Sequence, residues 1–401
     1  MNRQKRSQGE FVILMAALMS IVALSIDAVL PALPEIGDFL SVKNAEETPK
    51  IITTIFLGLG IGQLLFGPLS DSFGRKPIVY VGFIVFVIAS IICITTKNFE
   101  MMLFGRILQG IGLASPRTMC IAMVRDSYSG DYMAKILSIV VMVFILVPVV
   151  APTLGQFLMQ HYQWKSIFTF NLVFGVLVIL WFWLRQTETL KPQYKIPYRL
   201  SIFKDGTIAF FKIKPAVIYT ILSGLITGSF MVYLSTSQRI FERQYDMADE
   251  FPLIFASLAI SVGLATFLNS QLVVKYGMKR IVHISMLSFI IISLVFLLLY
   301  NGDKPSIAVL IGFFAIQFFT IGFLFGNLRA LAMEPMGHIA GIGSALNGFI
   351  STVMAVPIAD YIGKYVTDSV TPLFSGFLVC GLLSLALFYT LRKNVPVSVN
   401  A

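Results

Sequence analysis

Long runs of apolar residues alternate with short polar stretches along the chain. About 20 apolar residues in a helix cross the hydrocarbon core of a bilayer, and a helix satisfies its own backbone hydrogen bonds there. The pattern therefore predicts an all-α membrane protein with twelve transmembrane helices. Their expected ranges are 11–31, 50–70, 78–96, 101–123, 136–158, 165–185, 214–236, 252–274, 281–300, 306–328, 338–361 and 372–391.

The composition and the positions of the charges agree with this topology. Hydrophobic residues make up 57% of the chain and charged residues 12%, whereas soluble domains carry about 25% charged residues. With the N-terminus inside, about 20 of the 30 Lys and Arg fall on inner loops and tails, which is the positive-inside bias. This bias explains the net charge of +10 better than a nucleic-acid partner does. We expect a multi-pass protein of a bacterial-type inner (plasma) membrane, with both termini cytoplasmic and no nucleic-acid partner.

The chain lacks the usual signatures of an enzyme. Cys93, Cys120 and Cys380 lie in predicted spans, the three histidines are scattered, and no metal-ligand spacing, nucleophile elbow or Walker loop is present. The sequence therefore predicts no enzymatic activity, no cofactor and no bound metal. We expect a monomer whose partners are the lipid bilayer, a small substrate and protons.

Two short inner loops indicate an internal duplication. Gly74 is followed by basic residues between the second and third predicted spans, and Gly277 is followed by basic residues between the eighth and ninth, about half a chain length later. Transporters built from repeats often retain such weak internal symmetry. The expected organisation is an N-terminal six-helix bundle (1–185), a cytoplasmic linker (186–213) and a C-terminal six-helix bundle (214–401), related by pseudo-two-fold symmetry.

The first of these loops carries a family resemblance. It reads GPLSDSFGRKP and resembles the signature loop of the major facilitator superfamily, G-x-L-x-D-x-x-G-R-K, at the place where that family has it. Residues 106–110, RILQG, are similar to that family's R-x-x-Q-G motif. The resemblance extends over the whole chain and implies the major facilitator fold. The matching loop residues are Gly67, Leu69, Asp71, Gly74, Arg75 and Lys76.

Three further stretches are similar to the bicyclomycin/chloramphenicol-resistance (Bcr/CflA) branch of drug:proton antiporters: residues 25–34, 147–155 and 340–345. This likeness implies proton-coupled efflux of amphipathic drugs and antibiotics by alternating access. Transport of a specific metabolite, such as an amino acid or small peptide, is the alternative. A membrane sensor or scaffold that has lost transport is a third possibility.

The fifth span contains the helix-bend motif of that resemblance. Pro148 and Pro152 are one turn apart and Gly155 follows, a spacing that bends a helix. The antiporter motif usually reads G-P-x-x-G-G, whereas this chain has APTLGQ at 151–156. The Ala151 and Gln156 departures weaken the antiporter inference.

Asp27 and Arg106 are the candidate proton-coupling residues. Ionisable groups inside a bilayer are costly, so they indicate function. Asp27 is the only acid well inside the first ten spans, and Arg106 is expected at a similar depth near the outer end of span four. If both face one cavity, Arg106 can stabilise ionised Asp27 or compete with a cationic substrate for it. A local structural tie beside Pro31 is the alternative role for Asp27.

A second group of charges is expected at the inner surface, as a conformational switch. Asp71, Arg75 and the Arg125–Asp126 pair can hold helix ends together, although exposed pairs contribute only about 0–1 kcal/mol each. Gly67, Gly74 and Lys76 complete the loop, and Gly74 is expected to adopt a positive φ.

Candidates for the substrate cavity are polar and aromatic residues within spans. Arg117, about three helical turns below Arg106, is either a cavity charge or a side chain that reaches toward the inner face. The full set is Gln109, Arg117, Tyr219, Tyr233, Gln317 and Asn347.

Overall fold

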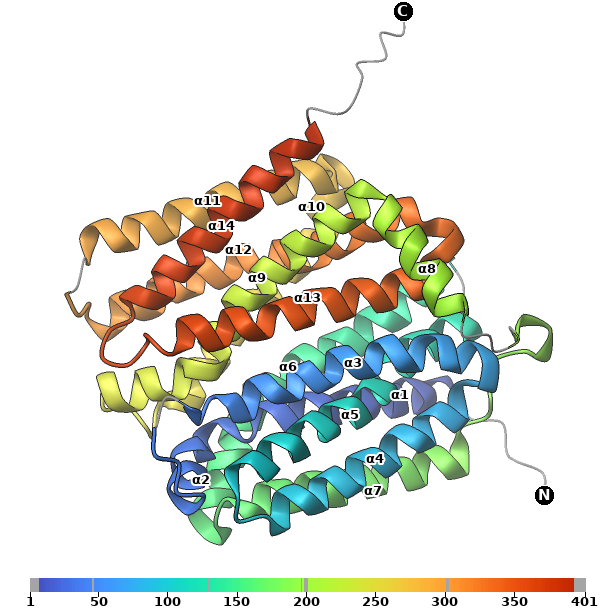
Figure 1. Cartoon of the computed structure of the whole chain (residues 1–401), viewed down its shortest axis with the longest axis horizontal. Helices are drawn as coiled ribbons and strands as arrows, with labels where there is room; N and C mark the ends of the chain where they lie inside the picture. The colour runs from blue at the N-terminus through green and yellow to red at the C-terminus, as the bar shows by residue number, and fades with distance from the viewer. Residues whose placement is uncertain are drawn as a thin grey trace, which may run out of the picture. The chain divides into compact units, whose positions relative to one another are not determined.

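The computed structural model describes residues 7–44, 47–128, 130–195, 197, 201–300 and 303–392, and all regular structure in these ranges is helical (Figure 1). Within the described residues, 11 helical segments are long and apolar enough to cross a membrane. The 33-residue helix α6, Gly130–Tyr162, contains the predicted fifth span and is the twelfth long helix. The prediction of a twelve-helix, all-α membrane protein is confirmed.

The first half of the chain forms six long helices, and the first of them is interrupted. A 3₁₀ turn, η1 (Leu30–Ala32), and a short helix, α2 (Leu33–Phe39), follow α1. The long helices are α1 (Gln8–Asp27), α3 (Lys50–Phe73), α4 (Arg75–Thr95), α5 (Phe99–Ser127), α6 and α7 (Lys165–Arg185).

The second half begins with a connecting helix, α8 (Ser201–Lys212), which a 3₁₀ turn, η3 (Pro192–Tyr194), precedes. A π-helical turn, η4 (Ile240–Gln244), extends α9, and η5 (Glu334–Ile339) joins α12 to α13. The long helices are α9 (Lys214–Arg239), α10 (Phe251–Tyr276), α11 (Met278–Leu299), α12 (Ile307–Met333), α13 (Ala340–Gly363) and α14 (Thr371–Arg392).

The chain divides into two compact units. One comprises Met1–Phe203 with Ser235–Ile260, and the other comprises Lys204–Leu234 with Ser261–Ala401. The end of α9 and the start of α10 thus pack with the first unit. The division into bundles 1–185 and 214–401 with a 186–213 linker stays a prediction, and linker residues 196 and 198–200 lie outside the described residues.

Small residues let α3 and α5 cross at very short range. An added Cβ would lie 2.0 Å from the Ile107 carbonyl oxygen at Gly58, and 2.0 Å from the Ile55 carbonyl oxygen at Gly110. Only glycine fits at either position, and such close backbone approach is typical of helix packing in membranes. Gly110 belongs to the RILQG motif, so the motif's glycine serves this helix crossing.

Candidate functional site

The signature loop is a single-residue connection between two helices. α3 ends at Phe73 and α4 begins at Arg75, with Gly74 between them at φ +106° and ψ 162°. L-residues with a side chain rarely adopt this conformation, so the positive φ predicted for Gly74 is confirmed. Gly277 joins α10 to α11 in the same way at φ +76°, which matches the predicted duplication of the turn.

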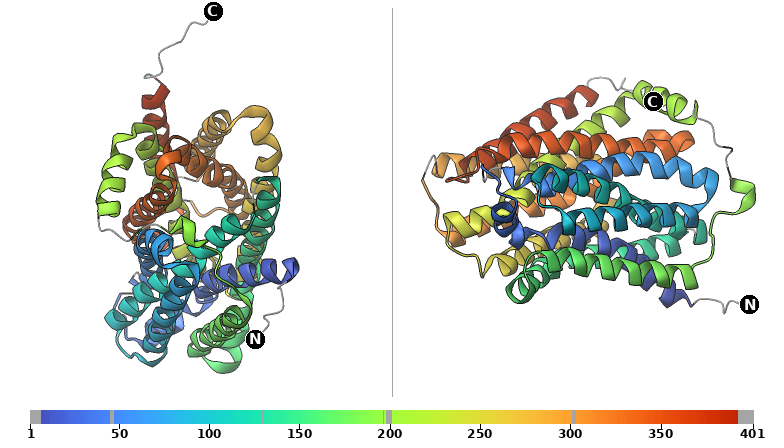
Figure 2. Two further views of the ribbon diagram at one scale, coloured as in Figure 1. Left: turned by 90° about the vertical axis from the view of Figure 1, so that its right-hand side faces the viewer. Right: turned by 60° about the horizontal axis from the view of Figure 1, so that its bottom comes forward.

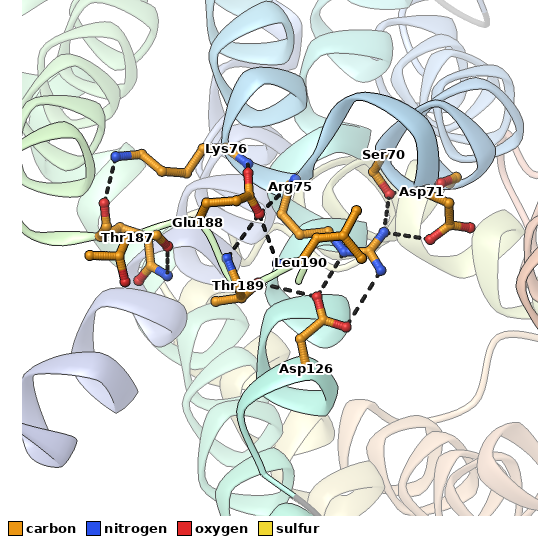
Figure 3. Close-up of polar contacts among 11 residues, drawn as sticks. Ser70, Asp71, Arg75, Lys76, Asp126, Thr187, Glu188, Thr189 and Leu190 are labelled. Atoms are coloured by element: carbon orange, nitrogen blue, oxygen red, sulfur yellow. Dashed lines mark hydrogen bonds and ion pairs between the residues drawn. The ribbon is translucent and has the colours of Figure 1, made fainter. Parts of the chain in front are cut away.

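Arg75 joins the ends of three helices, α3, α4 and α5 (Figure 3). Its Nη1 donates to Asp71 Oδ1 on α3 and to Ser70 Oγ, each at 2.6 Å, and its Nε donates to Asp126 Oδ2 on α5 at 2.8 Å. The Arg75 side chain is only 3% exposed, against 28% for Asp71 and 13% for Asp126. The expectation of exposed, weak pairs was wrong for Arg75, because α3 and α5 enclose its guanidinium.

Glu188 adds a fourth segment to this network. Its Oε1 accepts from the Arg75 backbone N–H at 3.1 Å and its Oε2 from the Lys76 backbone N–H at 3.0 Å (Figure 3). A carboxylate there satisfies unpaired N–H groups of the first turn of α4 and interacts favourably with the helix dipole. Lys76 Nζ also donates to the Gln186 carbonyl at 2.5 Å, and Thr189 Oγ1 donates to Asp126 Oδ2 at 3.1 Å.

We name this cluster the inner network, after the side of the membrane predicted for the signature loop: Ser70, Asp71, Arg75, Lys76, Asp126, Gln186, Glu188 and Thr189. The sequence reasoning missed Gln186, Glu188 and Thr189. The only signal was an acidic residue, Glu188, three residues after the sixth predicted span, within the expected cytoplasmic linker. The network draws the segment after α7 against α3, α4 and α5.

The other predicted switch residues have different positions. The Arg125 side chain is exposed and makes no ion pair with any described residue. Neighbouring residues on a helix point about 100° apart, so Arg125 does not share the direction of Asp126. Gly67 supplies a carbonyl that accepts from Ser70 Oγ at 2.7 Å. Asp126, rather than an Arg125–Asp126 pair, is the α5 contribution to the inner network.

Arg106 lies in a second cluster, in the interior of the first unit. Its side chain is fully buried on α5. Nε donates to the Ile51 carbonyl on α3 at 2.9 Å, and Nη1 donates to the Ser25 carbonyl on α1 at 3.0 Å. Nη1 also donates to Gln109 Oε1 at 2.6 Å, and the guanidinium lies 5.6 Å from the centre of the Phe168 ring on α7. Arg106 thus contacts α1, α3 and α7 from α5.

Gln109 extends this cluster to a fifth helix. Its Nε2 donates to Ser90 Oγ on α4 at 2.9 Å, so both ends of the amide are bonded. Arg106 Nη2 is buried and makes no hydrogen bond with any described residue. Gln109 is therefore held in the interior of the first unit, and Nη2 is the one guanidinium nitrogen of Arg106 still available for an acceptor.

Asp27 is the last residue of α1 and its side chain is 5% exposed. Within the described part of the chain, no ion pair joins Asp27 to Arg106. Arg106 instead bonds the carbonyl of Ser25, one of the last carbonyls of α1, which lack partners in their own helix. A cation at a helix C-terminus is electrostatically favourable. Arg106 therefore stabilises the end of α1 at which Asp27 lies, and a role for the two in proton coupling stays a prediction.

The helix-bend motif packs against this same end of α1. α6 runs through Pro148 and Pro152 without a break, and an added Cβ at Gly155 would lie 2.0 Å from the Ala28 carbonyl oxygen. Gly155 thus lets α6 approach the chain just after Asp27. Gln156, where the antiporter motif has glycine, places its Nε2 3.3 Å from Asp249 Oδ1 in the η4–α10 connection.

The candidate cavity residues of the second unit are buried among its own helices. Tyr233 packs 4.5 Å from Phe318, centre to centre, and Gln317 Nε2 donates to Ser293 Oγ at 3.0 Å. Asn347 Nδ2 donates to Thr220 Oγ1 at 2.8 Å, and Tyr219 is 5% exposed. In the first unit, Arg117 is half-buried on α5. A role for these residues in binding substrate stays a prediction.

Comparison with known proteins places this architecture in a family. The model of the family described as Major Facilitator Superfamily matches residues 14–359. The chain is 26% identical over 398 residues to the "Bicyclomycin resistance protein homolog" of Haemophilus influenzae, covering 98% of both chains. It is 28% identical over 382 residues to "Multidrug resistance protein MdtL" of Shewanella oneidensis, covering 94% of both.

A solved structure supports the fold. The structure of a D-xylose-proton symporter superposes with a TM-score of 0.75 at 17% sequence identity, covering 96% of this chain and 98% of that one. At this identity the likeness concerns the fold alone.

Proposed function

Since the chain belongs to the Major Facilitator Superfamily, we propose that it is a secondary transporter that exports amphipathic small molecules, antibiotics among them, in exchange for protons. The names of the relatives, a bicyclomycin resistance protein homolog and multidrug resistance proteins, support a drug-like substrate. The positive-inside bias supports cytoplasmic termini. In this proposal the transporter acts as a monomer.

The observation that carries the proposal is the buried Asp27 carboxylate at the point where α1 is interrupted. Discontinuous helices supply ion and substrate sites in secondary transporters. Asp27 is 5% exposed and lies two residues after Ser25, whose carbonyl accepts a hydrogen bond from Arg106. In our proposal Asp27 takes up a proton from one side of the membrane and releases it to the other.

Arg106 has the second role in this proposal. Two of its nitrogens fix the ends of α1 and α3, and Nη2 is available for an anionic acceptor. When Asp27 loses its proton, movement of α1 brings the carboxylate to Nη2, and this pairing stabilises the ionised form. A cationic group on the substrate then competes with Arg106 for Asp27, which links substrate binding to proton release.

The test uses a bacterial host that lacks its own drug exporters. The host expresses either the wild-type chain or Asp27→Asn, and membrane abundance is measured for both. We expect wild-type expression to raise the inhibitory concentration of bicyclomycin or another amphipathic antibiotic, a protonophore to remove the effect, and Asp27→Asn to lack it at equal abundance. If Asp27→Asn still protects the host from the antibiotic, Asp27 is not the proton carrier. Release of one metabolite without protection from any drug would favour the metabolite alternative.

A further inference from the structure

The connecting helix α8 exposes apolar side chains outside the predicted spans. Ile208 is 45% exposed and Phe211 is 56% exposed. The opposite face packs against the second unit: Phe210 is fully buried, and an added Cβ at Gly206 would lie 2.7 Å from the Ile342 side chain of α13. The outward apolar residues are therefore not needed to hold α8 in place.

Basic residues flank this apolar pair. Lys204 and Lys212 are exposed and lie one helical turn before and after Ile208, and Lys214 follows at the start of α9. Asp205, also exposed, is the one acidic residue of α8. The outer face of α8 thus combines apolar residues at its centre with a net positive charge.

The direction of α8 suits a membrane surface. α8 ends one residue before α9, which is apolar enough to cross the bilayer. Figures 1 and 2 show α8 crossing the direction of the long helices of its unit instead of extending α9. A helix joined to the end of a span and turned across it runs along the interface, where apolar residues enter the acyl boundary and lysines reach the phosphates.

We propose that the outer face of α8, formed by Lys204, Ile208, Phe211 and Lys212, lies on the inner surface of the membrane and binds anionic phospholipid. The charge argues for this occupant, because clusters of lysine next to a span attract anionic headgroups. The site is separate from Asp27 and the inner network and goes beyond the proposed transport function.

The experiment measures where α8 lies relative to lipid in the full-length protein. A nitroxide label on Ile208→Cys is studied in nanodiscs of phosphatidylcholine alone or with phosphatidylglycerol, by its accessibility to oxygen and to a water-soluble nickel chelate. The three native cysteines are buried, so labelling is directed to position 208. Both leaflets of a nanodisc are alike, so the test does not depend on the proposed orientation or on transport activity.

We expect the label to be several-fold more accessible to oxygen than to the nickel chelate, and more so with phosphatidylglycerol. Lys204→Gln with Lys212→Gln should remove the dependence on phosphatidylglycerol. The control is Lys191→Gln with Lys195→Gln, which makes the same charge change on exposed residues outside α8 and should keep it.

Two outcomes would overturn the proposal. A label that is as accessible to the nickel chelate as to oxygen in both kinds of nanodisc would place the face in water. The label could also stay protected from the nickel chelate in detergent without phospholipid and lose this protection on deletion of residues 393–401. That result would show that the chain's own C-terminal segment covers the outer face of α8.

Discussion

The guanidinium of Arg106 donates a hydrogen bond to the carbonyl oxygen of Ser25 across 3.0 Å, two residues before Asp27. This contact connects the R-x-x-Q-G motif on α5 to the end of α1. An arginine that bonds backbone carbonyls fixes the position of a helix end whether or not Asp27 is charged. The same residue can therefore hold the structure and act in proton coupling.

Replacement of Arg106 should separate these two roles. Arg106→Gln loses the bonds to Ser25 and Ile51, and it leaves the Ser25 carbonyl near the end of α1 without a partner, which costs about 1–3 kcal/mol of unfolding free energy. Asp27→Asn leaves those bonds in place, so we expect wild-type thermal stability with coupling lost. Thermal unfolding in detergent, followed by tryptophan fluorescence, measures the difference. Equal stability of Arg106→Gln and wild type would contradict the structural role.

Gly74 and Gly277 offer a matched comparison. Both have positive φ, so alanine at either position should cost about 1–3 kcal/mol in backbone strain. At Gly74 the new Cβ would also lie 2.7 Å from Glu188 Oε2, whereas at Gly277 it meets nothing within 4 Å. We expect Gly74→Ala to lower the unfolding temperature more than Gly277→Ala and to slow transport. Equal unfolding temperatures and transport rates of the two variants would show that the Glu188 side chain can move away from the new Cβ without loss of stability.

Glu188 should matter through its position at the start of α4. Glu188→Ala removes the acceptor for two backbone N–H groups of α4 and for those of Thr189 and Leu190. We expect a loss of about 1 kcal/mol in unfolding free energy and slower transport. The control is Glu100→Ala, which removes an exposed acid from the first turn of α5. Unfolding in detergent and transport in proteoliposomes are the measurements. A larger effect at Glu100 would mean that charge near a helix start, and not the Glu188 contacts, is responsible.

The two carboxylates around Arg75 should differ in their contribution to stability. Asp126 is 13% exposed and Asp71 is 28% exposed. We therefore expect Asp126→Asn to cost about 1–3 kcal/mol and Asp71→Asn about 0–1 kcal/mol. Asp71→Asn should still slow transport more than it weakens substrate binding, which initial rates and equilibrium binding separate. A binding defect as large as the rate defect would contradict a switch role for Asp71.

The apolar runs by themselves determined the number and order of the helices, because the need to satisfy backbone hydrogen bonds in a bilayer leaves few alternatives to a helix. The residues of the two short loops determined the glycine turns at Gly74 and Gly277, since a positive φ is a property of one residue. The apolar runs did not determine where each helix ends. The first span was expected to continue to Pro31, whereas α1 ends at Asp27 and a 3₁₀ turn follows.

Only the tertiary structure decided which polar groups meet. Arg106 was expected at a depth similar to that of Asp27, and it donates hydrogen bonds to the carbonyls of Ser25 and Ile51. Arg75 pairs with Asp126, whereas Arg125 is exposed. Glu188, from the segment expected to be a cytoplasmic linker, accepts two hydrogen bonds from backbone N–H groups at the start of α4. Hydropathy along the sequence indicates where each span lies, and hence the approximate depth of a residue in the membrane. The partner of a side chain depends on how neighbouring helices are rotated and how closely they cross, which close approaches such as Gly58 to Ile107 determine.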